Sequence, residues 1–329
     1  MDMECIVVKE VGSFEAARLP VRPPEAGEVL VQVLVTGLCR TDLKLIRVGH
    51  RDLVLPRVPG EEVVGRVAAT GPGVSAFEPG DLVYVYPGEW CGDCPPCRRG
   101  ADNLCRGMRI MGFHRDGGFA EYVTVSARSL IPVPDGLEPD RAVFAEPLSC
   151  CLNALERAGL KAGGAVAVWG AGPAGTLLAR AASALGADAV NVDPDPLRRA
   201  ACSGFERCPD RSFDVCVVAV GARDAYAEAI DRLGPRGRLV VFSGLSPADE
   251  RMEVSLNRLH YQEQTLAGAY GCAYRHGVSA LNLIATGAVP VADLVSHRLP
   301  LGRLAEALEL VATRRCMKVL LYPEGGPAR

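Results

Sequence analysis

Four cysteines lie close together in one segment of the chain. Cys91, Cys94, Cys97 and Cys105 are separated by glycine, proline and other residues typical of loops. Four thiolates complete the tetrahedral shell of a zinc ion, with Zn–S bonds of about 2.3 Å and no open position. Two-residue spacers disfavour unstrained disulfides, and a reducing compartment keeps such thiols reduced. The spacing therefore predicts a structural zinc ion that holds a loop together and performs no chemistry.

A glycine-rich segment follows an apolar run and precedes a stretch rich in alanine and leucine. Glycines let a diphosphate approach the backbone, and a helix N-terminus offers N–H groups and a positive dipole end. In this context the pattern predicts a dinucleotide-binding loop, with a plain strand-to-helix turn as the alternative. The loop residues are Gly170, Gly172, Pro173, Ala174 and Gly175.

An acidic residue, Asp193, ends the next expected strand, about twenty residues beyond the glycines. A carboxylate there accepts hydrogen bonds from the adenosine ribose diol and repels a 2′-phosphate. The sequence therefore favours NAD over NADP as the cofactor. Arg198, which we also expect to bind the cofactor, and Arg199 weigh against that choice.

A thiol and a hydroxyl stand two residues apart at Cys39 and Thr41. Oxidation of an alcohol on a metal needs a ligand for the metal and a hydroxyl that passes the proton towards solvent. A single buried cysteine is more often core filler, so Cys39 needs support from other motifs.

The segments that must position these residues change in character near Ser149. The first third has short β segments broken by glycine and proline, which favours an all-β, barrel-like domain. Later strands alternate with helices, as in a doubly wound parallel α/β sheet. We expect domains at residues 1–148 and 149–272, with residues 273–329 returning to the first domain. The expected strands are Val29–Val35, Val63–Ala68, Leu82–Tyr86, Ala165–Trp169, Ala189–Val192, Asp214–Ala219, Arg238–Phe242, Thr265–Ala267 and Lys318–Tyr322, and the expected helices are Thr176–Leu185 and Leu304–Thr313.

The composition describes an ordinary globular protein. The chain has 329 residues, 49% of them hydrophobic and 23% charged, with a net charge of -3. These values exclude a long disordered tail and give no reason to expect a nucleic-acid partner. The N-terminus lacks a secretory signal, and no apolar run reaches the roughly 18–20 residues of a membrane helix. We expect a cytoplasmic protein without a membrane partner.

Together these motifs resemble the zinc-containing medium-chain dehydrogenases, particularly the sorbitol and threonine dehydrogenase branch. The resemblance implies a GroES-like catalytic domain, a Rossmann domain, hydride transfer to the nicotinamide, and a homodimer or homotetramer. The matching segments are Gly37–Asp42, Pro59–Gly65, Cys91–Cys105, Asp116–Tyr122, Ala145–Leu148, Gly170–Gly175 and Leu259–Tyr261.

One matching segment departs from the family pattern. The second catalytic zinc ligand is usually the histidine of a Gly-His-Glu triplet, but this chain reads Gly60-Glu61-Glu62. The resemblance then leaves Cys39, Glu61 or Glu62, and Glu146 of the Glu-Pro motif as ligands. A carboxylate binds zinc at about 2.0–2.2 Å. We therefore expect Cys39, Glu61 and Glu146 to hold a catalytic zinc, with Glu62 binding it directly or supporting a ligand.

An unmetallated site is the alternative, in which Glu61 and Glu62 face solvent or pair with Arg40 or Arg57. Another acid would then be needed, and His50 or His114 could serve as acid, base or proton relay. The remaining histidines, His260, His276 and His297, are expected to be structural.

A second departure is a shortened segment between Asp193 and Asp214, by about one strand–helix unit relative to the family. The sequence as a whole predicts an NAD-dependent oxidation of a secondary alcohol to a ketone. The small-molecule substrate would be a polyol, cyclitol, sugar derivative or amino alcohol, with Thr41 and His50 as the proton relay. The alternatives are a zinc-free reductase of the same fold and a non-catalytic NAD-binding protein.

Overall fold

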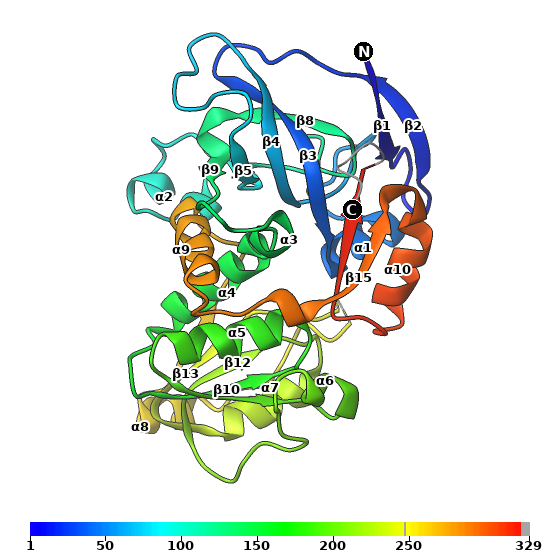
Figure 1. Ribbon diagram of the computed structural model, residues 1–329. Helices are drawn as coiled ribbons and strands as arrows, with labels where there is room; N and C mark the ends of the chain where they lie inside the picture. Colours follow the sequence, from blue (N-terminus) through cyan, green and yellow to red (C-terminus); the bar gives the residue numbers. More distant parts are fainter. Residues whose placement is uncertain (247, 324–329) are drawn as a thin grey trace. The chain divides into compact units, whose positions relative to one another are not determined.

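The computed structural model describes residues 1–246 and 248–323, which form two compact units (Figure 1). The first unit contains Met1–Glu146, Ala273–Ala285 and the segment that begins at Leu294. The second contains Pro147–Cys272 and Thr286–Asp293. The expected boundary at residue 148 therefore lies two residues after the observed division.

The segment Thr286–Asp293 was expected with the first domain, but it groups with the second unit. The guanidinium of Arg180 explains this placement. It donates to the carbonyl of Pro290 at 2.5 Å and to the carboxylate of Asp293 at 2.5 and 2.8 Å. These bonds fasten the returning chain to a helix of the second unit.

The first unit is built around a seven-stranded sheet with the order β15-β16-β3-β4-β5-β9, in which β8 also pairs with β3. The β-rich first third expected from the sequence is confirmed. Its strands are β1 (Asp2–Val7), β2 (Glu15–Pro20), β3 (Glu28–Leu38), β4 (Glu62–Thr70), β5 (Leu82–Val85), β6 (Gly88–Glu89), β7 (Arg109–Ile110), β8 (Tyr122–Ser126), β9 (Leu130–Pro132), β15 (Val295–Pro300) and β16 (Lys318–Tyr322). Its helices are α1 (Arg40–Arg47), α2 (Pro95–Arg98), α3 (Pro139–Ala142), α9 (Tyr274–Ala285) and α10 (Leu304–Ala312).

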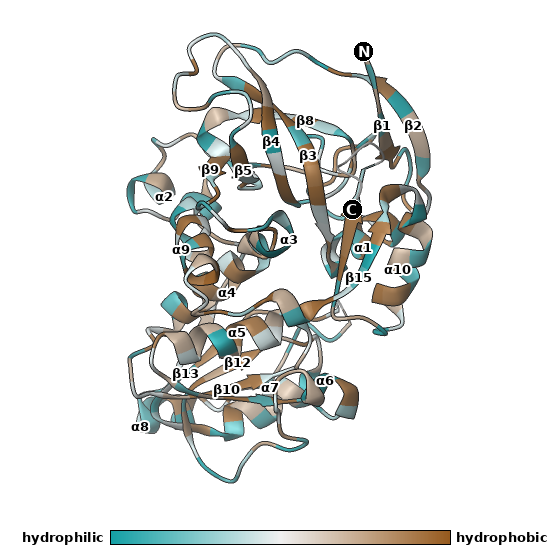
Figure 2. Ribbon diagram, in the orientation of Figure 1, coloured by the Kyte–Doolittle hydropathy of each residue, from teal (hydrophilic) through white to brown (hydrophobic). Residues whose placement is uncertain are grey.

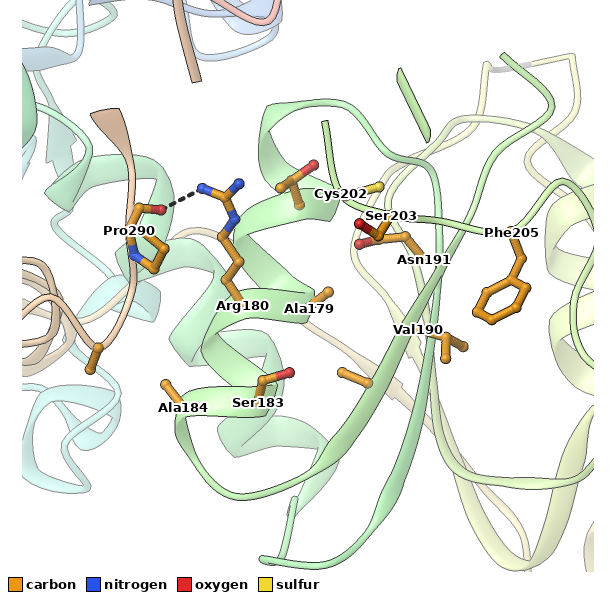
Figure 3. Close-up of a pocket in the computed structure, with 13 residues that line it drawn as sticks. Ala179, Arg180, Ser183, Ala184, Val190, Asn191, Cys202, Ser203, Phe205 and Pro290 are labelled. Atoms are coloured by element: carbon orange, nitrogen blue, oxygen red, sulfur yellow. Dashed lines mark hydrogen bonds between the residues drawn. The ribbon is translucent and has the colours of Figure 1, made fainter. Parts of the chain in front are cut away.

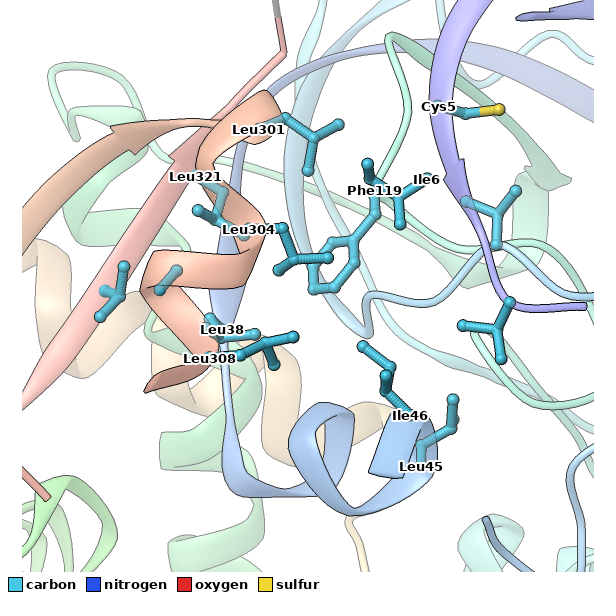
Figure 4. Close-up of a cluster of buried hydrophobic side chains, with 14 of the residues drawn as sticks. Cys5, Ile6, Leu38, Leu45, Ile46, Phe119, Leu301, Leu304, Leu308 and Leu321 are labelled. Carbon is cyan, nitrogen blue, oxygen red and sulfur yellow. The ribbon is translucent and has the colours of Figure 1, made fainter. Parts of the chain in front are cut away.

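Helices α1 and α10 cover one end of this sheet with a shared apolar core (Figure 4). In α10, Leu304, Leu308 and Val311 recur at helical spacing and are buried, while Ala305, Glu306 and Glu309 face solvent. Figure 2 shows this alternation as brown and teal residues on the same helix. Leu38, at the end of β3, and Leu45 and Ile46 of α1 belong to this core, which therefore fixes the end of β3 from which α1 begins.

The second unit is a five-stranded parallel sheet with the order β11-β10-β12-β13-β14. Parallel strands flanked by helices are buried on both faces, which explains the continuous apolar run of β10. Among the described helices, none is both long and apolar enough to cross a bilayer. The elements are β10 (Ala165–Trp169), β11 (Asp188–Val192), β12 (Phe213–Val218), β13 (Leu233–Val241), β14 (Thr265–Gly268), α4 (Ala145–Ala158), α5 (Pro173–Ala184), α6 (Pro196–Ala200), α7 (Arg223–Asp231) and α8 (Leu256–Gln262).

Strand β11 is the edge of this sheet, in agreement with the shortened segment inferred from the sequence. Within the described ranges its outer side is paired only by one bridge, between Val192 and Phe205. The N–H of Phe205 donates to the carbonyl of Asn191 at 2.8 Å, and the N–H of Asp193 donates to the carbonyl of Phe205 at 3.0 Å. Phe205 alone therefore pairs with the outer side of β11 in the described ranges, where a further strand could pair.

Candidate active site and metal-binding residues

The four sulfurs of the cysteine segment lie in one group, all within 4.8 Å of one another. The separations are 3.4 Å for Cys94 and Cys97, 3.5 Å for Cys91 and Cys105, and 3.9 Å for two further pairs. Zn–S bonds of about 2.3 Å in a tetrahedron place sulfurs about 3.8 Å apart. The donor type and the spacing therefore fit zinc without movement of the loop.

Backbone N–H groups point at these sulfurs. Cys105 Sγ accepts from the N–H of Cys91 and of Gly107, both at 3.3 Å, and Cys91 Sγ accepts from the N–H of Cys94 at 3.4 Å. The backbone N–H of Arg106, with other donors, lowers the pKa of Cys94 to about 6. These bonds favour the thiolate of Cys94, which is the form that binds metal. Burial and a hydrogen bond with Cys94 instead raise the pKa of Cys97 to about 12.

Cys39 joins the end of β3 to the start of α1, where it is the N-cap residue. Its Sγ accepts the backbone N–H of Thr41 at 3.2 Å, and Asp42 Oδ2 accepts the N–H of Cys39 at 3.0 Å. This reciprocal cap fixes the thiol at the positive end of the helix. Thr41, which the sequence analysis paired with Cys39, therefore contacts the thiol through its backbone N–H.

Buried acidic groups surround this thiol. Asp42 and Glu62 are each only 1% exposed. Burial raises the pKa of Asp42 to about 6, and the charge of Glu62 adds to the effect. Burial also raises the pKa of the Cys39 thiol well above its usual value, and the negative charges of Asp42, Glu62 and Glu61 raise it further. The structure therefore brings Cys39, Glu61 and Glu62 together as the sequence motifs imply.

Lys318, which the sequence did not single out, brings a positive charge into this cluster. Its ammonium forms a buried ion pair with the carboxylate of Glu62. Burial alone would lower the pKa of Lys318, but the charges of Glu62, Cys39 and Glu146 outweigh it and raise the value. The only sequence signal was a lysine at the start of an otherwise apolar strand, Lys318–Tyr322.

Glycine at position 37 makes that ion pair possible. In the strand order β16-β3-β4, Gly37 pairs with Glu62 on one side and with Leu320 on the other. A Cβ on Gly37 would lie 1.9 Å from Glu62 Oε2 and 2.9 Å from Lys318 Cε. The lysine reaches its partner across a strand position that has no side chain.

The expected zinc ligands are not all within binding distance of one another. Among the described residues, Cys39 and Glu61 belong to no group of three donor atoms within 4.8 Å, whereas Glu146 does. Glu146 lies in the first turn of α4 and is a charged neighbour of Lys318. A metal bound by all three residues would therefore require side-chain movement.

Two residues of the unmetallated alternative, Glu62 and Arg57, have other partners in the structure. Glu62 binds Lys318, and Arg57 donates to Asp116 at 2.7 Å. The proposed pairing of Glu62 with Arg57 is therefore wrong, because each residue has a nearer partner of opposite charge.

The candidate histidines have structural contacts. His50 Nδ1 accepts the N–H of Asp52 at 3.2 Å, and its ring packs edge-to-face on Phe113. Burial lowers the pKa of His50. His114 Nδ1 accepts the N–H of Ile110 at 3.1 Å. In each ring Nδ1 accepts a hydrogen bond from the backbone of the same loop, so any proton relay would use Nε2.

The glycine-rich loop has the close contacts that require glycine. Gly170 has a φ of +104°, and a Cβ on Gly175 would lie 1.9 Å from the carbonyl oxygen of Gly170. Gly172 is the N-cap of α5, and Pro173 opens the helix. A substituent on Gly172 would meet Arg198 Nη1 at 2.5 Å. The guanidinium therefore lies against the loop that is expected to bind a diphosphate.

The side chains of Asp193 and Asn191 form hydrogen bonds with the backbone of this loop. Asp193, 8% exposed, accepts the N–H of Ala171 at 2.7 Å and the N–H of Asp195 at 2.9 Å. Asn191 Nδ2 donates to the carbonyls of Gly170 at 3.2 Å and Gly175 at 3.0 Å. Asn191 was missed, although a polar residue in the apolar strand Asp188–Val192 was a usable signal.

A groove of about 410 Å³ runs along the edge of the second unit between α5 and β11 (Figure 3). Arg180, Asn191, Cys202 and Phe205 line it, and Arg180 reaches Pro290 at one end. The groove lies beside the strand that the shortened segment leaves at the edge of the sheet.

A parallel sheet with a dinucleotide-type glycine loop and a β unit with a four-cysteine lobe define a nicotinamide-dependent dehydrogenase. Residues 25–135 match the alcohol dehydrogenase GroES-like domain. The chain is 35% identical over 319 residues to D-altritol 5-dehydrogenase of Agrobacterium fabrum (strain C58), covering 92% of this chain and 94% of the relative. The chain belongs to the zinc-containing medium-chain alcohol dehydrogenase family, so the expected family, fold class and enzyme class are confirmed.

Two solved structures have the same fold. A zinc-binding dehydrogenase from Sinorhizobium meliloti 1021, bound to NADP, has a TM-score of 0.90 and 28% identity, covering 98% of this chain and 100% of that one. An alcohol dehydrogenase from Escherichia coli CFT073, complexed with NADH, has a TM-score of 0.90 and 25% identity, covering 98% and 99%. Relatives of this fold therefore bind either coenzyme.

Proposed function

We propose that this dehydrogenase oxidises a secondary hydroxyl of a polyol or sugar derivative to a ketone, with NAD as the hydride acceptor. The relative named D-altritol 5-dehydrogenase, 35% identical, supports a polyol substrate. The observation that carries the proposal is the buried cluster around Cys39, because a desolvated thiol beside Glu61 and Glu62 favours a bound cation.

Charge balance supports a metal in this cluster. Asp42, Glu61, Glu62 and Glu146 are its acidic groups, and the positive charge of Lys318 acts on Asp42, Glu62 and Glu146. We propose Cys39, Glu61 and Glu146 as the zinc ligands, with Glu62 held beside them by Lys318. A zinc ion bound there supplies Lewis-acid polarisation of the substrate oxygen. Four cysteines, Cys91, Cys94, Cys97 and Cys105, hold a second, structural zinc ion.

The proton released by the alcohol leaves through Thr41 and His50 in this proposal. Thr41 is exposed in the first turn of α1, so its hydroxyl can exchange protons with water. His50 keeps Nε2 for the transfer while Nδ1 accepts the N–H of Asp52. The lowered pKa of His50 favours the neutral ring, which can accept a proton.

NAD is the proposed coenzyme because the carboxylate of Asp193 lies against the glycine loop. Both oxygens of Asp193 accept backbone N–H groups, and a carboxylate has further lone pairs for the ribose diol. A 2′-phosphate would meet the negative charge of Asp193. The position of Arg198 against Gly172 supports its proposed contact with the diphosphate. Fluorescence titration with NADH and NADPH tests this choice, and tighter binding of NADPH would overturn it.

The test of the reaction is turnover of zinc-loaded protein with NAD and a panel of polyols, sugar acids and amino alcohols. We expect NADH formation with at least one polyol. Protein that binds neither NADH nor NADPH would contradict the assignment. Size-exclusion chromatography with light scattering tests the homodimer or homotetramer that the family resemblance implies.

A zinc-free reductase is the second candidate, and the Lys318–Glu62 ion pair is the observation that favours it. An ammonium beside the acidic cluster supplies positive charge without a metal. Zinc analysis of Cys39→Ser separates the two candidates. Loss of one zinc ion per chain supports the zinc enzyme, and an unchanged zinc content supports the reductase.

A further inference from the structure

Helix α4 carries donor side chains along one side. Glu146, Cys150 and Asn153 recur at intervals of four and three residues, so they lie along the same face. Cys151 is different, because it is fully buried and its Sγ donates to the carbonyl of Ala174 at 3.5 Å. Two adjacent cysteines therefore have different surroundings, and only Cys150 shares a face with a carboxylate.

The loop after β14 presents a second thiol to this face. Asn153 Nδ2 donates to the carbonyls of Tyr270 at 3.3 Å and Gly271 at 2.8 Å. Gly271 has a φ of +54°, which turns the chain directly before Cys272. Asn153 is 5% exposed and Cys272 is also 5% exposed. Two buried hydrogen bonds therefore hold the backbone that carries Cys272 against α4.

Cys150 is the centre of the resulting donor group. Its Sγ lies within 4.8 Å of Cys272 Sγ and of a carboxylate oxygen of Glu146, one helical turn earlier. Donor atoms on a tetrahedral zinc ion lie about 3.6–3.8 Å apart for sulfur and oxygen ligands. The observed upper limit of 4.8 Å is about 1 Å longer than these separations.

We propose that Cys150, Cys272 and Glu146 bind a divalent cation of the zinc type. Two thiolates select zinc, cobalt or cadmium over magnesium and calcium, which prefer oxygen ligands. Three protein donors leave one position of a tetrahedral ion open to a small ligand. Asn153 is a positioning residue, since it orients the loop and does not touch the ion.

This inference rests on the proposed function in one respect, because Glu146 is also a ligand of the zinc position proposed above. The Gly60-Glu61-Glu62 segment lacks the imidazole of the family. Glu146 would then be shared between the two ligand sets. If a single ion binds to Glu146, Cys150 and Cys272 provide thiolate ligands for that ion in a chain that lacks the usual histidine.

Cobalt absorption of the full-length protein tests the proposal. Each cobalt–thiolate bond adds charge-transfer absorption in the near ultraviolet. We expect Cys150→Ser and Cys272→Ser each to lower that absorption and the cobalt content relative to the unaltered chain. Cys151→Ser is the matched control, and it should keep both. Unchanged spectra in both test variants would overturn the proposal.

A second measurement needs no variant. Alkylation with iodoacetamide, followed by peptide mass spectrometry, should modify Cys150 more slowly in the zinc-loaded protein than after chelation. Equal rates in the two states would also overturn the proposal.

The two proposals fail in different assays. Cobalt bound through Cys150 in protein that binds no coenzyme would keep this inference and contradict the dehydrogenase function. Turnover that is lost in Cys39→Ser, with unchanged cobalt spectra in Cys150→Ser and Cys272→Ser, would support the dehydrogenase function and contradict this inference.

Discussion

Lys318 and Glu62 are 256 positions apart in the chain and form an ion pair in which the side chains are 4% and 1% exposed. Strand β16 places the ammonium beside β3, and Gly37 leaves the gap through which it reaches β4. This pair holds Glu62, the second residue after Gly60, in the interior, whereas Glu61 is half-buried. Strand β16 thereby contributes a positive charge to a site that begins at Cys39.

Replacement of the lysine should destabilise the protein. In Lys318→Met the carboxylate of Glu62 loses its buried partner, which costs about 3–5 kcal/mol of unfolding free energy. Urea denaturation measures the change. The double variant with Glu62→Gln should recover a large part of the loss, because the side chain at position 62 then carries no charge that needs a buried partner. Lys161→Met, at an exposed position, is the control. A loss in Lys318→Met no larger than in the control would contradict the role of the pair.

Gly37→Ala should act on the same pair from the neighbouring strand. Its Cβ would lie 1.9 Å from Glu62 Oε2, so the carboxylate must move away from Lys318. We expect a loss of about 1–3 kcal/mol, as for other overpacked cores. Gly268→Ala is a matched control, because a Cβ there meets no atom within 4 Å. Similar unfolding curves for the two variants would show that position 37 tolerates a side chain.

Removal of one ligand should release the structural zinc ion. In Cys97→Ser the four-sulfur group keeps three thiolates, and we expect one zinc ion fewer per chain and a lower Tm. Metal analysis by mass spectrometry and thermal denaturation measure both effects. Cys202→Ser, outside every donor group of the described residues, should retain the metal. Full zinc content in Cys97→Ser would show that the lobe needs only three sulfurs.

Arg198→Ala should weaken coenzyme binding. The guanidinium lies against Gly172, and a charged hydrogen bond contributes about 1.5–3 kcal/mol, equivalent to roughly a 10- to 150-fold rise in Kd. Titration of NADH fluorescence gives the Kd. Arg207→Ala removes an exposed arginine of the same segment and should leave the Kd unchanged. Equal affinity for both variants would place the diphosphate away from Arg198.

The ion pair between Arg180 and Asp293 should make stability depend on acid. A hydrogen bond from Arg180 lowers the pKa of Asp293 below its usual value. The pair therefore stabilises the fold fully above the ordinary carboxyl pKa, and this contribution is lost as the pH falls through the folded-state pKa. Since Asp293 is 55% exposed, the effect is small.

Unfolding free energy measured from neutral to acidic pH checks this expectation. The unaltered chain should lose more stability on acidification than Asp293→Asn, which has no carboxyl group to protonate. Parallel curves for the two proteins would show that the pair contributes nothing measurable.

Much of the fold was predictable because its signals are local. The strand Ala165–Trp169 and the strand Lys318–Tyr322 have the bounds expected from apolar patterning alone. The cysteine lobe and the glycine loop were also found, since each motif lies within a short segment whose spacing carries the chemistry.

The edges of the expected elements were less accurate. Helix α5 begins at Pro173, three residues before the expected start, because Gly172 serves as its N-cap. Strand β13 begins at Leu233, five residues before the expected Arg238. Caps and strand pairing, which depend on neighbouring elements, determine these bounds.

The sequence by itself determined which residue types are available: thiols at lobe spacing, glycines before a helix, and carboxylates where the family has an imidazole. Only the tertiary structure decided that Lys318 neutralises Glu62, that Arg198 lies against Gly172, and that Cys272 meets Cys150. Each of these pairs depends on strand order or loop placement, and loop closure over such separations leaves no periodic pattern in the sequence.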